Sequence, residues 1–294
     1  MAVMQFDIVK NYTPTESQLL AEVGDADVVV FVGGISPSLE GEEMKVSEPG
    51  FKGGDRTDIE LPQAQRKVME MLHRAGKRVV FVNCSGSAIA MVPETENAES
   101  ILQAWYPGER GGEAVAKVLF GEVNPSGKLP VTFYKSTSDL PDFLDYTMKN
   151  RTYRYFKGEA LFPFGHGLSY TSYEYGKPVL KKVKNEERKV KNSSAYSLSF
   201  SLSNKGNREG TEVTQVYIRR MDDAEGPIKT LKAFKRITLK AGEKQQVTIS
   251  LPRQSFEGWD SQTNTMRVVP GKYQIFVGGS SAEAAKNVIE VKVI

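Results

Sequence analysis

Apolar residues in the first 120 positions form short continuous runs that alternate with helical periodicities. Residues 28–32 (VVVFV) and 78–83 (RVVFVN) are rich in β-branched side chains, which is typical of strands buried on both faces of a parallel sheet. A third strand is predicted at 101–105. A helix is predicted from Pro62, with Gly76 ending it, and another begins at Gly111-Gly112. This alternation predicts an α/β domain whose parallel sheet is covered on both faces.

Two further elements are predicted at the ends of this domain. Thr13-Pro14-Thr15-Glu16 has the form of a capping box with proline in the first turn, so a helix is expected through Leu19, Leu20 and Val23. At the other end, residues 124–133 (NPSGKLPVTF) are expected to add one more strand.

The second half of the chain alternates between apolar and polar residues. Short runs of this kind, separated by NKGN, KAGEK and PGK turns, are typical of an antiparallel β-sandwich of the immunoglobulin or fibronectin type. The predicted strands are 195–203, 212–219, 231–239, 245–251 and 273–277. Here no carboxylate pair or nucleophile motif stands out, which favours a structural or interaction role for this part of the chain.

A segment rich in aromatic residues, 139–176, separates the two patterns. Because few such rings can be left in water, we expect it to pack across the sheet domain or between domains. The fold class predicted is therefore α/β plus all-β. A mostly parallel α/β sandwich domain, 1–169, precedes a fibronectin type III-like sandwich, 170–294.

The long stretch from Ser36 to Glu60, directly after the first buried strand, is rich in carboxylates, prolines and glycines. It predicts a loop without regular structure, and long loops of this kind in compact domains tend to be functional. Ligands also gather where buried parallel strands end. One of these carboxylates is therefore the best candidate for a chemical role, and a solvated acidic loop is the alternative. Its few apolar anchors predict that it is the most mobile internal segment until a partner surface covers it.

Composition and charge narrow the functions that the chain can have. The net charge of +3 divides unevenly, with 17 basic and 23 acidic residues through Ser169, then 22 basic and 13 acidic residues from Tyr170. The lysines of the second half are scattered along strands, so nucleic acid is not an expected partner. No apolar run is long enough to cross a membrane, and no signal peptide is apparent at the start. The protein is therefore expected to be cytoplasmic, unless a targeting segment is missing from the sequence.

The sequence lacks residues that several common functional motifs require. The single cysteine, Cys84, excludes an internal disulfide, and two distant histidines predict no metal site. The paired glycines do not form a nucleotide-binding motif, so no cofactor is predicted. Residues 83–87 (NCSGS) follow a strand, but the pattern G-x-S-x-G is absent, which argues against an esterase using Ser85 or Ser87.

Taken together, the motifs resemble the C-terminal half of family-three glycoside hydrolases, the β-glucosidase and β-xylosidase family. The resemblance covers nearly the whole chain from Asp27. It depends on five segments together with the fibronectin-like pattern, since each segment alone is weak. The segments are DVVVFVGGISPSLEGEE, KGGDRTDIELP, AWYPGERGGEAVAKVLFGEVNPSGKLPVTF, YRYF and LFPFGHGLSYT.

The resemblance implies a role for the acidic loop. In this family the α/β domain lends a loop carboxylate to an active site on an N-terminal barrel, and the family pattern places the general acid/base on Glu40. Glu42 and Glu43 remain alternatives because the loop varies in length. Asp55 and Arg56, in the segment that closes the loop, are the candidates for substrate binding.

A second carboxylate is needed as nucleophile, about 5 to 5.5 Å across the sugar in a retaining enzyme. The family's nucleophile is a barrel aspartate beside tryptophan, and neither Trp105 nor Trp259 follows that pattern. We therefore expect a C-terminal fragment of a retaining, exo-acting glycosidase that is inactive alone. Its expected partners are an oligosaccharide or aryl glycoside and the barrel of the same protein, in a periplasmic or secreted location. The sequence of the loop resembles the β-xylosidase branch of the family more than the β-glucosidase branch. The alternative to an enzyme is a non-catalytic carbohydrate-binding or interaction module.

Overall fold

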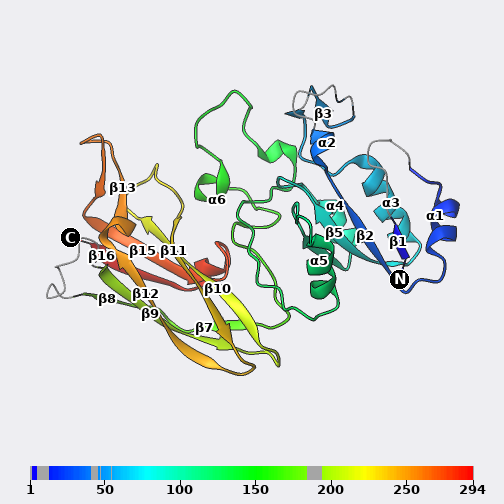
Figure 1. Ribbon diagram of the computed structural model, residues 1–294. Coiled ribbons are helices and arrows are strands. Elements are labelled where there is room, and N and C mark those ends of the chain that lie inside the picture. The colour runs from blue at the N-terminus through cyan, green and yellow to red at the C-terminus, as the bar shows by residue number, and fades with distance from the viewer. Residues whose placement is uncertain are drawn as a thin grey trace. The chain divides into compact units, whose positions relative to one another are not determined.

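The computed structural model describes residues 2–4, 13–40, 46, 48–53, 55–183 and 194–293. By their internal contacts these residues form two compact units (Figure 1). The first unit comprises Met1–Phe120, Phe133–Asp145 and Gly158–Leu161. The second comprises Gly121–Thr132, Tyr146–Lys157 and Phe162–Ile294. Each unit is assembled from several segments of the chain according to their contacts, whereas the predicted boundary after Ser169 is a single break in the sequence. That boundary stays a prediction.

The first unit is built on a parallel sheet of four strands in the order β1-β2-β5-β6. The strands are β1 (Ala2–Met4), β2 (Val28–Gly34), β5 (Arg78–Cys84) and β6 (Ser100–Gln103). The predicted parallel sheet is thus confirmed. Because all four strands run the same way, the carboxyl ends of β2, β5 and β6 lie along one edge of the sheet.

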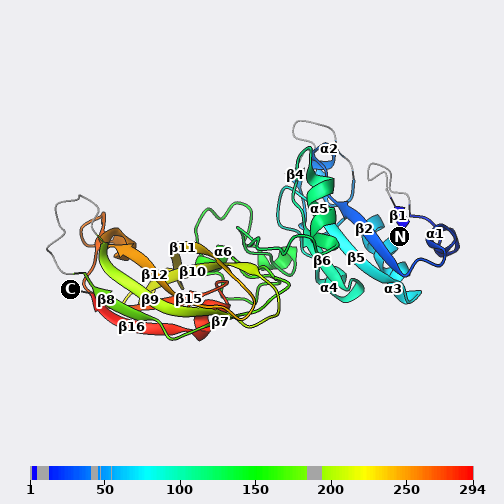
Figure 2. The ribbon, with the colours of Figure 1, turned by 60° about the horizontal axis from the view of Figure 1, so that its bottom comes forward.

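Helices of the first unit pack against this sheet or continue from its strands (Figure 2). They are α1 (Glu16–Val23), α2 (Pro37–Glu40), α3 (Gln63–Arg74), α4 (Val92–Asn97), α5 (Gly111–Leu119) and the 3-10 helix η1 (Thr137–Asp139). The apolar face of α3 contacts β2 and β5, and its residues Val68, Met69 and Leu72 are fully buried. Phe31 and Phe81 lie in the same core with ring centroids 5.7 Å apart.

Burial of β2 is one-sided, contrary to the prediction of a strand buried on both faces. Val29 and Phe31 are fully buried, whereas Val32 is 41% exposed. Successive side chains of a strand point to opposite faces, so Val29 and Phe31 lie on one face of β2 and Val32 lies on the other. The apolar run therefore correctly predicted a strand, but it overstated how far the described residues cover the second face.

Two predicted elements differ in the structure. The capping box belongs to Thr15 and Gln18: Gln18 N donates to Thr15 Oγ1 over 3.3 Å and Thr15 N donates to Gln18 Oε1 over 3.0 Å. Thr13 and Pro14 precede that box, and the predicted helix itself is confirmed as α1. Residues 124–133 do not form a strand, because Pro125 and Pro130 remove backbone donors that a ladder needs.

The acidic stretch from Ser36 to Glu60 contains regular structure that was not predicted. Its first turn is the helix α2, and β3 (Phe51–Lys52) pairs with β4 (Asp55–Arg56) as a short antiparallel hairpin. Leu39 and Phe51 are buried, at 4% and 7% exposure, so two of its apolar residues anchor these elements to the first unit. The candidates Glu42 and Glu43 lie outside the described residues, and the predicted mobility stays a prediction.

The second unit is an antiparallel β-sandwich, as predicted. One sheet has the order β11-β10-β15-β16, and the other has β12-β9-β7 with β8 also paired to β9. The five predicted strands are confirmed as β9 (Ser194–Asn204), β10 (Gly210–Arg220), β11 (Thr230–Leu239), β12 (Lys244–Pro252) and β15 (Gly271–Gly278). The elements that were not predicted are α6 (Thr152–Tyr155), β7 (Tyr173–Tyr175), β8 (Val179–Lys182), η3 (Arg253–Phe256), β13 (Glu257–Asp260), β14 (Thr265–Val268), η4 (Glu283–Lys286) and β16 (Val288–Val293).

Part of the aromatic segment packs on this sandwich. Tyr153 and Phe164 stack with centroids 4.2 Å apart, and Tyr153 meets the fully buried Tyr217 edge-on at 5.8 Å. The expectation that few of the rings lie in water is wrong for Phe143 and Tyr146, which are 88% and 87% exposed. The segment is therefore not uniformly packed, because only some of its rings find a partner surface in the described residues.

Candidate functional site

Glu40 lies just beyond the carboxyl end of β2, at the end of the short helix α2. The turn begins at Ser36, whose carbonyl accepts hydrogen bonds from Leu39 N at 3.0 Å and Glu40 N at 2.9 Å. The Ser36 hydroxyl also accepts from Leu39 N at 3.2 Å. Ile35 and Leu39 are buried, at 2% and 4% exposure, and they fix the turn to the sheet edge.

A close backbone approach fixes the direction in which the chain leaves β2. Gly34 has φ +125°, and a Cβ there would stand 2.0 Å from the carbonyl oxygen of Cys84. Ile35 N donates to that same oxygen at 2.9 Å. The buried Gln65 of α3 also accepts from Gly34 N at 2.7 Å and donates to Gly34 O at 2.8 Å. The strand end that precedes Glu40 is thus held from two sides.

The carboxylate of Glu40 accepts a hydrogen bond from the hydroxyl of Tyr106, with 3.1 Å between Glu40 Oε2 and the phenolic oxygen. Tyr106 follows Trp105, whose backbone is left-handed at φ +58° and whose ring packs edge-on against Phe133 at 6.2 Å. Partial burial, together with the negative charge and hydrogen bond of Glu40, raises the pKa of Tyr106 to about 12. The phenol therefore stays protonated and remains a donor through neutral pH.

Gly86 lets these two side chains approach the end of β5. A Cβ on Gly86 would stand 2.8 Å from Tyr106 Cε2 and 3.5 Å from Glu40 Oε2. Any larger residue there would displace the Tyr106 ring, and with it the donor to Glu40.

Arg56 of β4 belongs to the same cluster. Its Nη1 donates to Ser87 Oγ at 3.3 Å and its Nη2 to the carbonyl of Glu60 at 3.0 Å, while its buried Nε has no partner among the described residues. Burial lowers the pKa of Arg56, and the nearby Asp58, Glu40 and Glu60 oppose that effect. Of the predicted site residues, the structure thus brings Glu40 and Arg56 together, and Tyr106 lies close to both.

Asp55 is the predicted site residue that the structure does not bring into the cluster. It is exposed on β4, where it pairs with Lys52 across the hairpin. It stays a candidate for substrate binding with no described contact to support it.

Ser85 has a structural task. Its fully buried hydroxyl donates to the carbonyl of Ser87 at 2.9 Å and accepts from Gln103 Nε2 at 3.1 Å. The amide of Asn83 completes this network by donating to Gln103 Oε1 at 2.6 Å. A hydroxyl used in this way is not presented to a substrate, which agrees with the missing esterase motif.

A second buried network anchors the far end of the acidic stretch. Arg66 of α3 contacts Glu94, which is fully buried, at 2.7 Å, and Glu60 at 3.1 Å. Its Nη2 also donates to the carbonyl of Ala90 at 3.1 Å. These contacts tie residue 60 to α3 and α4, so both ends of the acidic stretch are fixed to the same unit.

The cluster offers one carboxylate with a neutral hydroxyl donor and a neighbouring cation at the edge of a parallel sheet. Such a carboxylate can exchange a proton with a bound substrate. The described residues contain no group of histidine, cysteine, aspartate and glutamate side chains placed to hold a metal ion. Sequence reasoning did not identify Tyr106, Gly86 or Gln65, because their proximity to Glu40 depends on the order of strands in the sheet.

Comparisons with known proteins match both units. The C-terminal domain family of glycosyl hydrolase family 3 matches residues 5–170, and the fibronectin type III-like domain family matches residues 212–281. A xylan 1,4-β-xylosidase of Xylanibacter ruminicola is 49% identical over 96% of this chain and 32% of its own length. A periplasmic β-glucosidase of Salmonella typhimurium is 34% identical over 90% of this chain and 34% of its own length.

Solved structures agree with these matches. A β-glucosidase from Erythrobacter marinus has a TM-score of 0.75 at 34% identity, over 95% of this chain and 36% of that one. A family 3 β-glucosidase from Bifidobacterium adolescentis has a TM-score of 0.80 at 27% identity, over 95% and 40%. The chain thus spans about a third of the length of the curated relatives named above. It belongs to the C-terminal domain family of glycosyl hydrolase family 3, and a fibronectin type III-like domain follows in the same chain.

Proposed function

We propose that Glu40 is the general acid/base of a retaining, exo-acting glycoside hydrolase. The chain supplies it on α2 to an active site that a barrel domain of the same protein completes. The observation that carries the proposal is the position of Glu40, beyond a buried strand at the sheet edge, with its carboxylate held by Tyr106 at 3.1 Å. Membership in a family of glycosyl hydrolases supports the reaction class.

In the proposed reaction, protonated Glu40 gives its proton to the departing glycosidic oxygen while a barrel aspartate forms a covalent bond to the sugar. The Glu40 carboxylate then takes a proton from the water that cleaves this intermediate. Tyr106 holds one carboxyl oxygen of Glu40 and leaves the other for the substrate. Arg56, whose Nε has no partner among the described residues, is proposed to contact the sugar.

The proposed substrates are β-xylosides. The identity of 49% to a xylan 1,4-β-xylosidase supports this choice, and β-glucosides are the second candidate because a β-glucosidase is 34% identical. Comparing kcat/KM for aryl β-xylosides and aryl β-glucosides in the protein that contains both this chain and the barrel decides between them. A higher value for the glucoside would reverse the assignment.

Substituting Glu40 tests the acid/base role. Glu40→Gln is expected to slow substrates with poor leaving groups by about 10² to 10⁴, since general acid help is typically of that size. Activated aryl glycosides need little protonation at the first step and should be affected much less. The matched controls are Glu42→Gln and Glu43→Gln. A uniform effect of Glu40→Gln on both substrate types, with the selective loss in a control, would move the role to that glutamate.

The chain alone is proposed to hydrolyse no glycoside, because the nucleophile has to be held rigidly on the far side of the sugar. Turnover by the purified 294-residue chain, with contaminating enzyme excluded, would contradict this and leave the barrel without a required role. A periplasmic or secreted location is proposed from the relative named as periplasmic. No helix in the described part of the chain is long and apolar enough to cross a membrane.

A further inference from the structure

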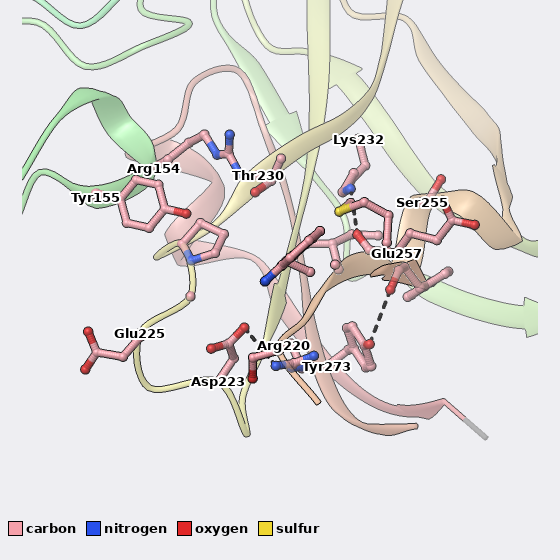
Figure 3. A pocket seen from close by; sticks show the side chains of 18 residues that line it. Arg154, Tyr155, Arg220, Asp223, Glu225, Thr230, Lys232, Ser255, Glu257 and Tyr273 are labelled. Carbon is pink, nitrogen blue, oxygen red and sulfur yellow. Dashed lines mark hydrogen bonds and ion pairs between the residues drawn. The ribbon is translucent and has the colours of Figure 1, made fainter. Parts of the chain in front are cut away.

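The second unit contains a cavity of about 410 Å³ whose lining has an unusual charge arrangement (Figure 3). Its volume falls within the range of roughly 300 to 1,000 Å³ that small-molecule sites occupy. The lining residues come from α6, the end of β10, β11, η3, the hairpin β13–β14 and β15, so the cavity is formed within this one unit.

Two cations that line the cavity, Arg154 and Lys232, form no ion pair with any residue that the structure describes, whereas a third, Arg220, is paired with Asp223 at 2.9 Å. Arg154 of α6 forms no ion pair within the described ranges, its buried Nε has no hydrogen-bond partner there, and its guanidinium lies 5.5 Å from the centroid of the Tyr155 ring. Among the described residues, the ammonium of Lys232 on β11 donates only to the backbone carbonyl of Glu257, at 3.3 Å. Burial, and then the charge of Arg154, lowers the pKa of Lys232, while the charge of Glu257 opposes that shift without cancelling it. An anion between the two cations would relieve both effects.

The remaining lining is suited to a sugar ring. Trp259 of β13 is 54% exposed, and a large exposed ring at the edge of a pocket offers an apolar face for stacking. Asp223 and Glu225 follow β10, and their carboxylate oxygens can accept hydrogen bonds from hydroxyl groups, although one oxygen of Asp223 is paired with Arg220 at 2.9 Å. In the view of Figure 3, Arg154 and Lys232 lie along the upper side of the cavity and these two acids along the lower side.

We propose that this cavity binds a saccharide that carries a carboxylate, with the carboxylate between Arg154 and Lys232 and a face of the ring against Trp259. A neutral sugar would leave the two cations unpaired, and a simple carboxylate would not use the aromatic face. An acidic peptide would satisfy the cations but offers no rigid apolar ring face bordered by hydroxyl groups. The site does not depend on Glu40 or on the proposed hydrolysis.

Binding is tested by the fluorescence of Trp259 in the 294-residue chain carrying Trp105→Phe, which leaves Trp259 as its single tryptophan. The probes are methyl β-glucuronoside, methyl β-glucoside, acetate and a di-aspartate peptide. The glucuronoside is expected to change the fluorescence with a dissociation constant about tenfold or more below those of the other three. The glucoside lacks the hydrogen bonds to charged groups, which each contribute roughly tenfold to a hundredfold, and acetate and the peptide lack the sugar ring that packs on Trp259. Equal binding of the glucoside, acetate or the peptide would overturn the proposal.

Charge substitutions test the named cations. Arg154→Gln and Lys232→Gln are each expected to weaken glucuronoside binding by about tenfold to a hundredfold. The matched control is Lys235→Gln, an exposed lysine on the same strand β11 outside the cavity lining, which should leave binding unchanged. Circular dichroism verifies the fold of each variant. If Arg154→Gln fails to fold, Lys232→Gln decides the question alone. Unchanged binding in Lys232→Gln, or an equal loss in Lys235→Gln, would refute the assignment.

Discussion

Gly34, at the end of β2, has no room for a side chain, and Gly34→Ala is expected to destabilise the first unit severely. Its φ of +125° lies outside the left-handed region that alanine tolerates best, which costs about 1–3 kcal/mol. The new Cβ would also stand 2.0 Å from the backbone oxygen of Cys84, so one of the two backbones has to move. That movement disturbs the bond from Ile35 N to Cys84 and the two bonds to Gln65, each with a net value of about 1 kcal/mol.

These contributions add to about 4–6 kcal/mol, against a total stability of about 5–15 kcal/mol for a typical domain. Gly24, the C-cap of α1, is the matched control. Its backbone, with φ +57° and ψ −134°, also has a conformation that favours glycine, but nothing lies within 4 Å of an added Cβ, so Gly24→Ala should cost only the strain of about 1–3 kcal/mol. The difference between the two alanine variants isolates the contact with Cys84 from the backbone conformation.

The assay is urea denaturation followed by the fluorescence of Trp105, which lies in the first unit, in a Trp259→Phe background. With a slope of about 1–3 kcal/mol per molar urea, Gly34→Ala should lower the midpoint by about 1 M or more relative to Gly24→Ala. Circular dichroism should show whether the Gly34 variant folds at all without urea. Equal midpoints for the two alanine variants would refute the steric argument, because they would mean that the backbone at Cys84 yields without cost.

Two further predictions concern the groups around the site. Arg66→Met leaves the fully buried Glu94 without its ion-pair partner and should lower the free energy of unfolding, measured by urea denaturation, by about 3–5 kcal/mol. The control is Lys67→Met, at an exposed neighbouring position on α3, which should change that free energy by less than about 0.5 kcal/mol. Similar losses in the two variants would show that the ion pair is not the cause. The raised pKa of Tyr106 means that its hydroxyl should ionise near pH 12 and that its stabilising effect should fall as the pH rises from about 10 to about 12. The phenolate absorbance difference between the wild-type chain and Tyr106→Phe measures this, and ionisation near pH 10 would contradict the influence of Glu40.

The sequence predicted most of the scaffold because its signals were local. Continuous β-branched runs identified β2 and β5, and period-two alternation identified five strands of the sandwich. Local signals also caused the errors. A strand was predicted at 124–133 although two prolines remove its backbone donors. The Thr13–Glu16 spacing resembled a capping box, but the real box, Thr15–Gln18, begins two residues later.

Only part of the candidate site could be predicted from the sequence. Glu40 could be placed because it follows a strand end directly, and the position of a strand end is a local property. Tyr106 is 66 positions away, and it reaches Glu40 because β6 lies two strands from β2 in the same parallel sheet, so that their carboxyl ends share one edge. The approach further requires a left-handed Trp105 and the absence of a side chain on Gly86.

The dependence of Glu40 on distant residues has a consequence for how the site tolerates change. A glutamate on a turn of four residues has few contacts of its own, so its orientation depends on the groups that meet it: Tyr106 from one strand end and the backbone that Gly34 anchors at another. A substitution at Gly86 changes no atom of Glu40, yet it displaces the ring whose hydroxyl holds the carboxylate. Because a proton donor misplaced by about 1 Å can lose on the order of a hundredfold in rate, a substitution at Gly86, which meets a side chain and not backbone, should affect the proposed chemistry more than the fold. The residues that orient Glu40 are therefore those that allow strand ends to approach closely, and they would be missed by a search for charged side chains.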